Sequence, residues 1–299
     1  MRTIPRIPIL LRARFVVSLA WFSVWGASVS VGLAGEPAAA PKVFENTLAM
    51  KFVPVAGTKV LFSIWPTRVQ DFAAFVQDTD YDATKDVFSL AGKGWVQVGD
   101  SWKNPGFKQG PTHPVCAVSW IDAHAFCAWL TKKERESGRI GRRQEYRLPT
   151  DSEWKVAVGL LDEVGGAPKK DADIFPWGSA WPPPSGSGNY AGEEAKDETW
   201  PIEWAPISGY NDGYPRTSPV GTFRANRFGL YDMSGNVWEW CEDLYDSKGI
   251  TRVVRGASYR VYLPELIKLT RRGDGQPDSR YVHRSFRCVL ADASSDSRN

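Results

Sequence analysis

A stretch of about fifty residues with little hydrophobic periodicity, from Pro176 to Asn226, restricts the fold of this chain most, since such long loops are uncommon in compact domains. Turn-forming residues interrupt it throughout, among them Pro182-Pro183-Pro184, Gly186, Gly188 and Asn211-Asp212-Gly213. A segment of this kind usually needs a ligand or a metal ion to order it. The 14 Trp, 27 Gly and 21 Pro among 299 residues further indicate a loop-rich fold around an aromatic core rather than a helical bundle.

The first 34 residues have the composition of an export signal. A segment with four arginines leads into the apolar run 15–33, and small residues stand at 32 and 34, which predicts cleavage after Ala34. The run is about as long as the ~20 residues that a membrane-spanning helix needs, so an uncleaved anchor is the alternative. We therefore expect an exported protein, periplasmic or secreted, that contacts a membrane only if this segment is retained.

The rest of the chain divides by composition into three parts. Residues 35–45 are rich in Pro and Ala and predict a linker. Residues 46–290 show no internal repeat and no second hydrophobic core, which predicts one domain, and 291–299 form a polar tail expected to be disordered. Without the four arginines of the signal, the formal net charge changes from +3 to −1. A nearly neutral body argues against nucleic acid as a partner.

Short strands and three helices are expected in this domain. Apolar patterns over 52–55 and 60–65, separated by Gly57, predict a β-hairpin. Helices are predicted after Thr67, Ser119 and Thr150, which are good N-cap residues, and Thr150 also forms a capping-box pattern with residue 153. Apolar runs near the C-terminus, at 253–255 and 286–290, predict late strands.

Four cysteines follow the signal: Cys116, Cys127, Cys241 and Cys288. An even number of cysteines in an exported chain favours disulfides, and four allow three pairings. No CxxC pair occurs and the three histidines are scattered, so the spacing does not predict a zinc site. If the protein stayed in a reducing compartment, these residues would be buried thiols.

The most distinctive motif spans residues 228–240, where a Gly-Asn turn precedes an acid between two tryptophans. The simplest interpretation is a core strand anchored by Trp238 and Trp240, with Glu239 in solvent. The alternative is a calcium loop, because Ca²⁺ takes about six to eight oxygens from carboxylates, Asn side chains and backbone carbonyls. Similar oxygen-rich turns stand at 189–190 and 212–214. From the residues alone, the strand is the favoured interpretation.

Several short segments, in order along the chain, resemble the formylglycine-generating enzyme family, also called the sulfatase-modifying factor family. They extend over about residues 44–290 and comprise 114–120, 122–123, 126–127, 146–150, 153–154, 176–178, 189–190, 219–221, 226–233, 235–240, 255–258 and 286–288. The resemblance implies an α+β fold, related to the C-type-lectin fold, with little regular secondary structure. It also makes calcium the favoured interpretation of the oxygen-rich turns.

In this family, two calcium sites and one disulfide are expected. The first site corresponds to the side chains of Asn189 and Asp212 with the carbonyl oxygens of Tyr190 and Tyr214. The second corresponds to the backbone oxygens of Ser234, Gly235 and Val237 with the side chain of Glu239. The family disulfide corresponds to Cys127 and Cys288, which leaves Cys116 and Cys241 for a second pair.

One departure from the family changes the expected chemistry. Family enzymes oxidise a substrate cysteine to formylglycine with copper held by two cysteines, which lie shortly after the segment matching 255–258. Counting along this chain places Val261 and Leu266 at those positions. Copper(I) prefers soft thiolate ligands, and neither side chain supplies one. The resemblance therefore implies a protein that binds calcium, does not bind copper and does not make formylglycine by the family mechanism.

Three functions are consistent with this sequence. The favoured one is a binding or scaffold domain whose ligand is an unknown peptide, glycan or protein, with Arg272, Asp274 and Arg287 as candidate groove residues. The second is a periplasmic tailoring oxidoreductase of the same family with different chemistry, which predicts a pocket containing an acid of perturbed pKa or another metal. The third is an intact formylglycine-generating oxidase acting on a sulfatase cysteine, against which the missing thiols argue.

Overall fold

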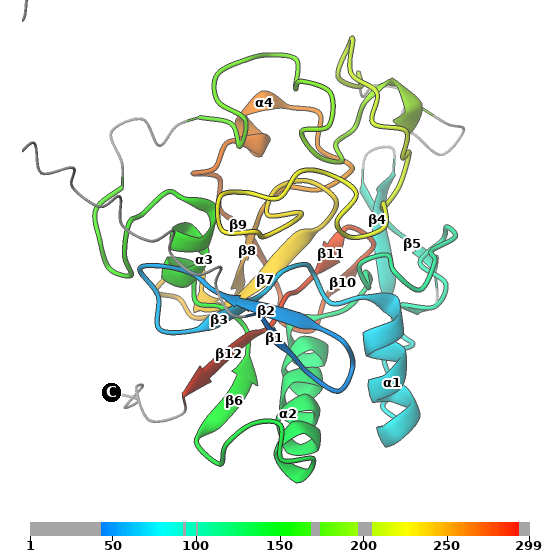
Figure 1. Ribbon diagram of the computed structural model, residues 1–299. Helices are drawn as coiled ribbons and strands as arrows, with labels where there is room; N and C mark the ends of the chain where they lie inside the picture. The colour runs from blue at the N-terminus through cyan, green and yellow to red at the C-terminus, as the bar shows by residue number, and fades with distance from the viewer. Residues whose placement is uncertain (1–42, 92–93, 100, 169–173, 197–204, 293–299) are drawn as a thin grey trace, which may run out of the picture. The chain divides into compact units, whose positions relative to one another are not determined.

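A computed structural model describes residues 43–91, 94–99, 101–168, 174–196 and 205–292 (Figure 1). The expected export signal and residues 293–299 lie outside these ranges. Within them, no helix combines the length and apolar character that crossing a membrane requires.

The described part of the chain combines short strands with few helices. The strands are β1 (Phe44–Glu45), β2 (Lys51–Pro54), β3 (Leu61–Ser63), β4 (Val87–Ala91), β5 (Gly94–Gly99), β6 (Gln144–Arg147), β7 (Trp238–Leu244), β8 (Arg252–Arg255), β9 (Gly273–Gly275), β10 (Arg280–Tyr281), β11 (Arg284–Ser285) and β12 (Val289–Asp292). The helices are α1 (Val69–Thr79), α2 (Trp120–Glu136), α3 (Asp151–Val158), the 3₁₀ turn η1 (Glu193–Ala195) and α4 (Pro264–Ile267). The expected α+β class is confirmed.

The strands of the described residues form three sheets. The first has the order β1-β2-β3-β12-β6, in which β12, the last strand of the chain's described part, lies between β3 and β6. All of its strand pairs are antiparallel. The second has the order β11-β7-β8-β9, with β11 parallel to β7. The third has the order β10-β4-β5. The expected hairpin is β2 with β3, in which Val53 pairs with Phe62.

The helix starts follow local capping chemistry. Ser119 accepts the N–H of Asp122, whose carboxylate accepts the N–H of Ser119, and Thr150 forms the same box at α3, as its sequence predicts. The expected cap of α1 is wrong by one residue, because Arg68 is the N-cap. Thr67 instead joins distant segments: its N–H donates to Phe286 and its carbonyl accepts from Val115.

Aromatic side chains form the centre of the main core, where both long helices meet the C-terminal segment. Phe72 of α1 stacks on Phe126 of α2 with ring centroids 6.0 Å apart, and Phe126 contacts Phe286 edge-on at 5.4 Å. A second core cluster gathers around Trp154 of α3 and Phe62 of β3. The aromatic core expected from the tryptophan-rich composition is therefore present in the described residues.

Strand pairing extends two residues beyond the expected domain bounds at each end. β1 takes in Phe44 and Glu45, which were expected to belong to the linker, because they pair with Phe52 and Lys51. Ala291 and Asp292, expected to start the tail, complete β12 by pairing with β6. Strand pairing, which local composition does not show, explains both corrections.

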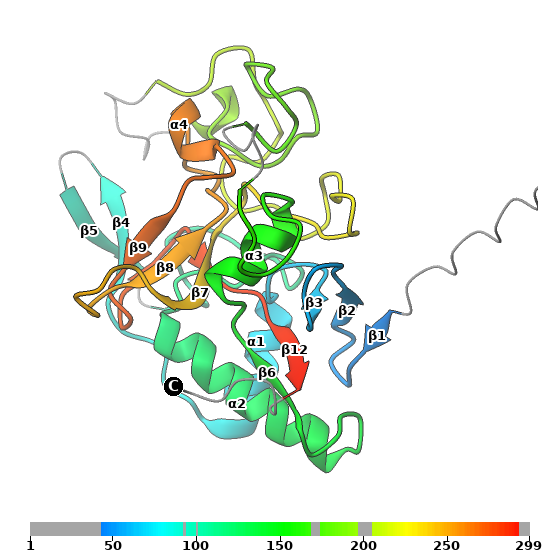
Figure 2. The same ribbon diagram turned by 90° about the vertical axis from the view of Figure 1, so that its left-hand side faces the viewer.

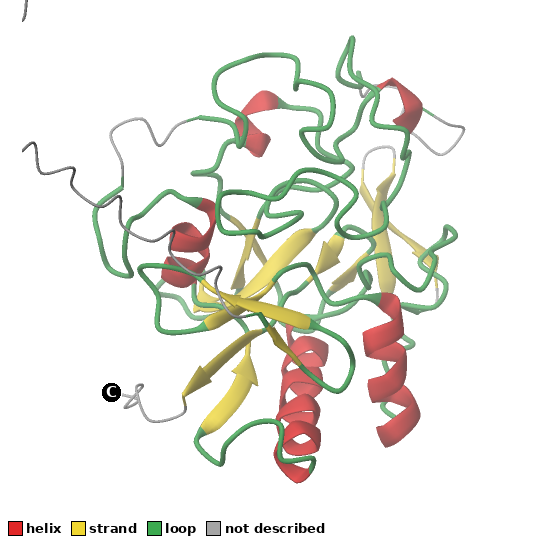
Figure 3. Cartoon of the chain, in the orientation of Figure 1, coloured by secondary structure: helices red, strands yellow, loops and turns green. Residues whose placement is uncertain are grey.

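Long loops gather at one end of the domain. Figure 3 shows the loop segments above the sheets, and in Figures 1 and 2 α4 and these loops lie at the opposite end from α1 and α2. The expected breaker-rich segment supplies many of them, with η1 as its short helical element. The candidate site lies in these loops.

Candidate functional site

Two turns of the breaker-rich segment are joined by side-chain hydrogen bonds. The carboxylate of Asp212 accepts the N–H of Tyr190 through Oδ2 and the N–H of Tyr214 through Oδ1, both at 2.9 Å. Asn189 is fully buried and donates from Nδ2 to the carbonyl of Arg216 at 2.8 Å. The structure thus brings together the residues expected at the first calcium site.

Several oxygens at this junction have no hydrogen-bond partner. They are Oδ1 of Asn189 and both carboxylate oxygens of Glu194, all buried. Burial, together with the negative charge of nearby Glu194, raises the pKa of Asp212 to about 7. Burial also raises the pKa of Glu194. Buried carboxylates that lie close together both stay charged only if a cation is near them.

The donor chemistry at the first site fits calcium. Carboxylate, amide and carbonyl oxygens are hard ligands of the kind that Ca²⁺ takes. Across the described residues, no group of three or more His, Cys, Asp or Glu side chains is placed to hold a metal, so the expected ligands are mainly amide and carbonyl oxygens. Asn189, Asp212 and the carbonyls of Tyr190 and Tyr214 would hold the ion, which would supply a positive charge between the two turns.

At the expected second site, a cation of the chain itself neutralises the carboxylate. Arg287 donates to Glu239 through Nη2 at 2.6 Å and through Nε at 2.7 Å, and Trp154 Nε1 donates to the same carboxylate at 3.3 Å. Both charged side chains are at most 1% exposed. Solvent exposure of Glu239, expected from the alternation in β7, is therefore wrong, because the acid has a buried partner 48 residues away.

The backbone at the second site is also engaged. The carbonyl of Gly235 accepts the N–H of Val237 at 2.8 Å, and the N–H of Gly235 donates to Gly256. The hydroxyl of Ser234 accepts from Tyr190 at 2.9 Å. Because Arg287 already neutralises Glu239, this carboxylate adds no net negative charge to attract an ion, and the two expected calcium sites stay predictions.

The positions that match the family's copper ligands are apolar in three dimensions as well as in sequence. Val261 is 6% exposed and belongs to the main core, and its carbonyl accepts the N–H of Ala191 at 3.1 Å. Leu266 lies in α4, which begins at Pro264, and packs against the same core. Neither position supplies a metal ligand.

All four cysteines are buried free thiols. The sulfur atoms of Cys127 and Cys288 are 3.6 Å apart, in α2 and just before β12. Cys116 donates to Gln109 Oε1 at 3.3 Å, whereas Cys241 packs in the second core cluster. The structure therefore brings Cys127 and Cys288 together and gives Cys116 and Cys241 different surroundings.

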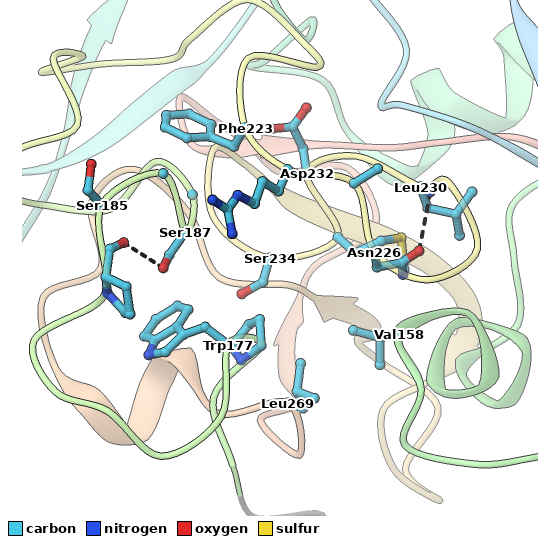
Figure 4. Close-up of a pocket in the computed structure, with 17 residues that line it drawn as sticks. Val158, Trp177, Ser185, Ser187, Phe223, Asn226, Leu230, Asp232, Ser234 and Leu269 are labelled. Carbon is cyan, nitrogen blue, oxygen red and sulfur yellow. Dashed lines mark hydrogen bonds between the residues drawn. The ribbon is translucent and has the colours of Figure 1, made fainter. Parts of the chain in front are cut away.

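A pocket of about 400 Å³ opens next to the first site (Figure 4). Its wall includes aromatic rings, hydroxyl groups and one buried acid. These come from Trp177, Phe223, Ser187, Ser234 and Asp232. Figure 4 shows Ser234 directed toward the side where Trp177 and Ser187 lie. Pockets of this size with a few polar groups are typical of small-ligand sites.

Tyr190 connects the pocket to the calcium site. Its N–H is held by Asp212, its ring packs edge-on against Trp177 with centroids 5.4 Å apart, and its hydroxyl donates to Ser234. One residue thus joins the oxygen-rich turn to two pocket walls. The position of that turn therefore affects where Trp177 and Ser234 lie in the pocket wall.

Comparison with known proteins supports this assignment of the fold. Residues 44–292 match the family described as "Sulfatase-modifying factor enzyme 1-like domain". The chain belongs to this family. It is 30% identical over 222 residues to the formylglycine-generating enzyme of Thermomonospora curvata, covering 65% of this chain and 63% of that one, so it spans less than two thirds of that relative.

Another curated relative and one solved structure are also similar to this chain. The chain is 29% identical over 261 residues to inactive C-alpha-formylglycine-generating enzyme 2 of Bos taurus, covering 76% of this chain and 75% of that protein. The solved structure of PvdO from Pseudomonas aeruginosa has the same fold, with a TM-score of 0.57 and 20% identity over 85% of this chain and 100% of that one.

The three expected groove residues lie outside the family domain's pocket. Arg287 is in the buried ion pair, and Arg272 donates to the carbonyls of Tyr245 and Leu244. Asp274 is exposed on β9, where its carbonyl accepts from Arg284. Charged side chains were expected at the surface of a groove, but those of Arg287 and Arg272 instead make bonds within the domain.

Sequence reasoning missed Glu194 and most of the pocket wall. Glu194 follows the Asn189-Tyr190 turn by four residues, and an acid so near an oxygen-rich turn was the available signal. The sequence contains no signal for Trp177 and Ser187. Loop residues come to line the same pocket only through the path of the folded chain, which local patterns do not show.

The buried ion pair predicts a large stability loss when one partner is removed. Arg287→Met should lower the free energy of unfolding by about 3–5 kcal/mol, because it leaves the Glu239 carboxylate charged and unpaired. The measurement is urea denaturation followed by tryptophan fluorescence. Lys132→Met is the control, since the Lys132–Glu136 pair is more than 60% exposed on both sides. It should change stability by less than about 0.5 kcal/mol. Equal effects of the two substitutions would contradict this account of the pair.

Proposed function

We propose that this chain is an exported sulfatase-modifying factor domain that binds a ligand in its loop region, is stabilised by one calcium ion and lacks copper-dependent formylglycine oxidation. The observation that carries the proposal is the pair Val261 and Leu266, which fills both thiol positions with apolar side chains packed in or against the core. Related proteins named formylglycine-generating enzymes set the expected activity, and the relative named inactive is a precedent for its loss.

Calcium supports binding in this proposal by fixing loop conformation. The turns at 189–190 and 212–216 are joined by the carboxylate of Asp212 and the amide of Asn189, so a bound cation would neutralise the negative charge at this junction. Because Tyr190 contacts Trp177 and Ser234, an ordered turn holds the pocket walls in place. The calcium ion takes part in no reaction step and serves as a structural link.

The ligand class follows from the pocket wall. Trp177 and Phe223 supply aromatic surface, and Ser187 and Ser234 supply hydroxyl groups. Flat apolar rings with nearby hydrogen-bonding groups suit sugar rings and extended peptides, which present both kinds of surface. A peptide or glycan segment of an exported partner is therefore the proposed ligand.

A second candidate function, a tailoring oxidoreductase, has one observation in its favour. Asp232 lines the pocket, and burial raises its pKa to about 6, which suits an acid–base role near neutral pH. One of its oxygens accepts the N–H of Gly221 at 2.9 Å, however, and Figure 4 shows its side chain extending toward Phe223. Asp232→Asn distinguishes the two functions. An oxidoreductase that uses this acid would lose turnover, whereas a binding domain would keep its affinity for the ligand.

The loss of oxidase activity is tested with the family reaction. The purified mature chain, loaded with copper under oxygen, is incubated with a peptide containing a Cys-x-Pro-x-Arg sequence, and the peptide mass is read. We expect no conversion of the cysteine to an aldehyde, because residues 261 and 266 provide no thiolate for copper(I). The Thermomonospora curvata enzyme serves as the positive control. Aldehyde formation by this chain would overturn the proposal.

Chelation tests the calcium proposal. Removing calcium with EGTA should lower the melting temperature by about 10 °C, since a ligand present at about 1,000 times its Kd adds about 4 kcal/mol to stability. Elemental analysis of the purified protein should find one calcium per chain, and Asp212→Asn should abolish the EGTA effect. A chain without calcium that melts identically with EGTA contradicts the site, and two ions per chain contradict the assignment of Arg287.

Thiol counting tests the proposed export to an oxidising compartment. Protein purified from the periplasm or medium and alkylated in denaturant without reductant should show two reactive thiols, Cys116 and Cys241, because Cys127 and Cys288 are adjacent. Closing a loop of 161 residues should add about 5 kcal/mol to stability in the chain-entropy model. Four reactive thiols would contradict the disulfide, and Cys127→Ala should give three.

A further inference from the structure

We propose that Glu194 is an additional ligand of the calcium ion, so that this chain holds the ion with two carboxylates where the family resemblance supplies one. The inference rests on the proposed calcium site at Asn189 and Asp212. It concerns a residue of this chain that the resemblance did not assign.

The backbone around Glu194 presents its carboxylate to the site. Glu194 lies in η1, which begins three residues after Tyr190, and both of its oxygens are buried without a hydrogen-bond partner. The carboxylate folds back over Gly192, where an added Cβ would lie 2.6 Å from Oε2 and 2.6 Å from the carbonyl of Tyr210. Only glycine at 192 leaves room for the acid in this position.

The contacts of Glu194 point to a cation rather than to a structural hydrogen bond. Burial raises the pKa of Glu194 although backbone N–H groups of Gly192, Glu194 and Asp212 near the carboxylate lower it, and neither carboxylate oxygen has a partner with hydrogen-bond geometry. Asp212, with its own carboxylate, is close enough for the two acids to repel. A carboxylate buried beside a second carboxylate, with both oxygens unused, needs a positive charge.

A second, independent observation that points to a ligand comes from the turn that Asp212 holds. Asn189 is completely buried, its Nδ2 is bound to the turn at Arg216, and its Oδ1 has no partner. An amide oxygen without a hydrogen bond in a protein interior is costly unless a ligand completes it. Asn189 thus supplies a neutral donor to the ion that the two acids would hold.

Charge balance agrees with this donor set. Asp212 and Glu194 together carry two negative charges, which match one Ca²⁺ without a buried residual charge. The neighbouring Glu193 has a different role: it is exposed, and its carboxylate accepts the N–H of Gly209 at 2.9 Å. The two adjacent acids of η1 therefore provide a matched pair, one directed to the ion and one to the backbone.

Calcium titration of the full mature chain tests the proposal, with Glu194→Gln as the variant and Glu193→Gln as the control. Both substitutions keep size and remove one charge. By isothermal titration calorimetry on EGTA-treated protein, Glu194→Gln should weaken calcium binding by about tenfold or more, because ligand charge sets affinity at such sites. Glu193→Gln should stay within about twofold of the unaltered chain.

A reversal of thermal stability provides a signature that a merely structural glutamate would not give. In EGTA, Glu194→Gln should melt above the unaltered chain, because the substitution removes repulsion with Asp212. With excess calcium it should melt below it, because a ligand is lost. A variant that melts lower by the same amount under both conditions would overturn the proposal.

The hydration of a bound lanthanide gives a measurement that does not depend on stability. Terbium replaces calcium at oxygen sites, and its luminescence lifetimes in H₂O and D₂O count the bound waters. Glu194→Gln should gain one or two waters relative to the unaltered chain and to Glu193→Gln. An unchanged water count together with unchanged calcium affinity overturns the role of Glu194 but leaves the calcium site standing. If the unaltered chain binds neither ion, both proposals fail.

Discussion

The ion pair between Glu239 and Arg287 is the interaction on which the rest of this domain depends. Arg287 donates not only to Glu239 of β7 but also to the carbonyls of Ser63, at the end of β3, and Tyr231, in the loop that leads to the motif. Two sheets and one loop thus meet at a single guanidinium that is fully buried. Arg287 lies beside Cys288 and directly before β12, so the last strand of the first sheet is positioned by a charge in the second. Because a buried charge without its partner is strongly destabilising, a register that separated Arg287 from Glu239 would cost about 3–5 kcal/mol.

The loop end of the domain is organised by a different principle. Around Arg287, positive charge comes from the chain itself and is surrounded by core, whereas the turns around Asn189 and Asp212 present negative and neutral oxygens with no cationic side chain bonded to them in the described residues. Long irregular loops bury too little apolar surface to offset the entropy of ordering them. A bound metal ion would compensate by joining several distant oxygens at once. The two expected calcium positions, both oxygen-rich in sequence, therefore differ in charge: among the described residues, the first presents oxygens with no bonded cation, whereas the second has a carboxylate paired with Arg287.

Local patterns predicted the elements that depend on neighbours in sequence. The β2–β3 hairpin and the caps Ser119 and Thr150 follow from alternation and from capping chemistry, and both are present. The errors concern residues whose partners are distant: Thr67 bonds the C-terminal segment instead of capping α1, and Glu239 is buried because Arg287 reaches it. At the candidate site, the resemblance located Asn189 and Asp212, but Glu194 became visible only when its oxygens proved buried and unpaired. Periodicity and composition carry no information on which loops converge, so the pocket wall could not be predicted.

The positions expected to hold copper and the residues that order the loops are different residues in this fold. A change at the copper positions can therefore leave the fold intact. Val261 and Leu266, at the positions of the two thiols, contribute apolar surface to the main core. Removing the oxygen ligands near Tyr190 would instead release a turn that supports Trp177 and Ser234. Selection for binding would therefore retain the turn and would be indifferent to the thiols. The combination in this chain, apolar residues at the copper positions beside a fully assembled set of hard oxygen donors, is the one that a binding function predicts.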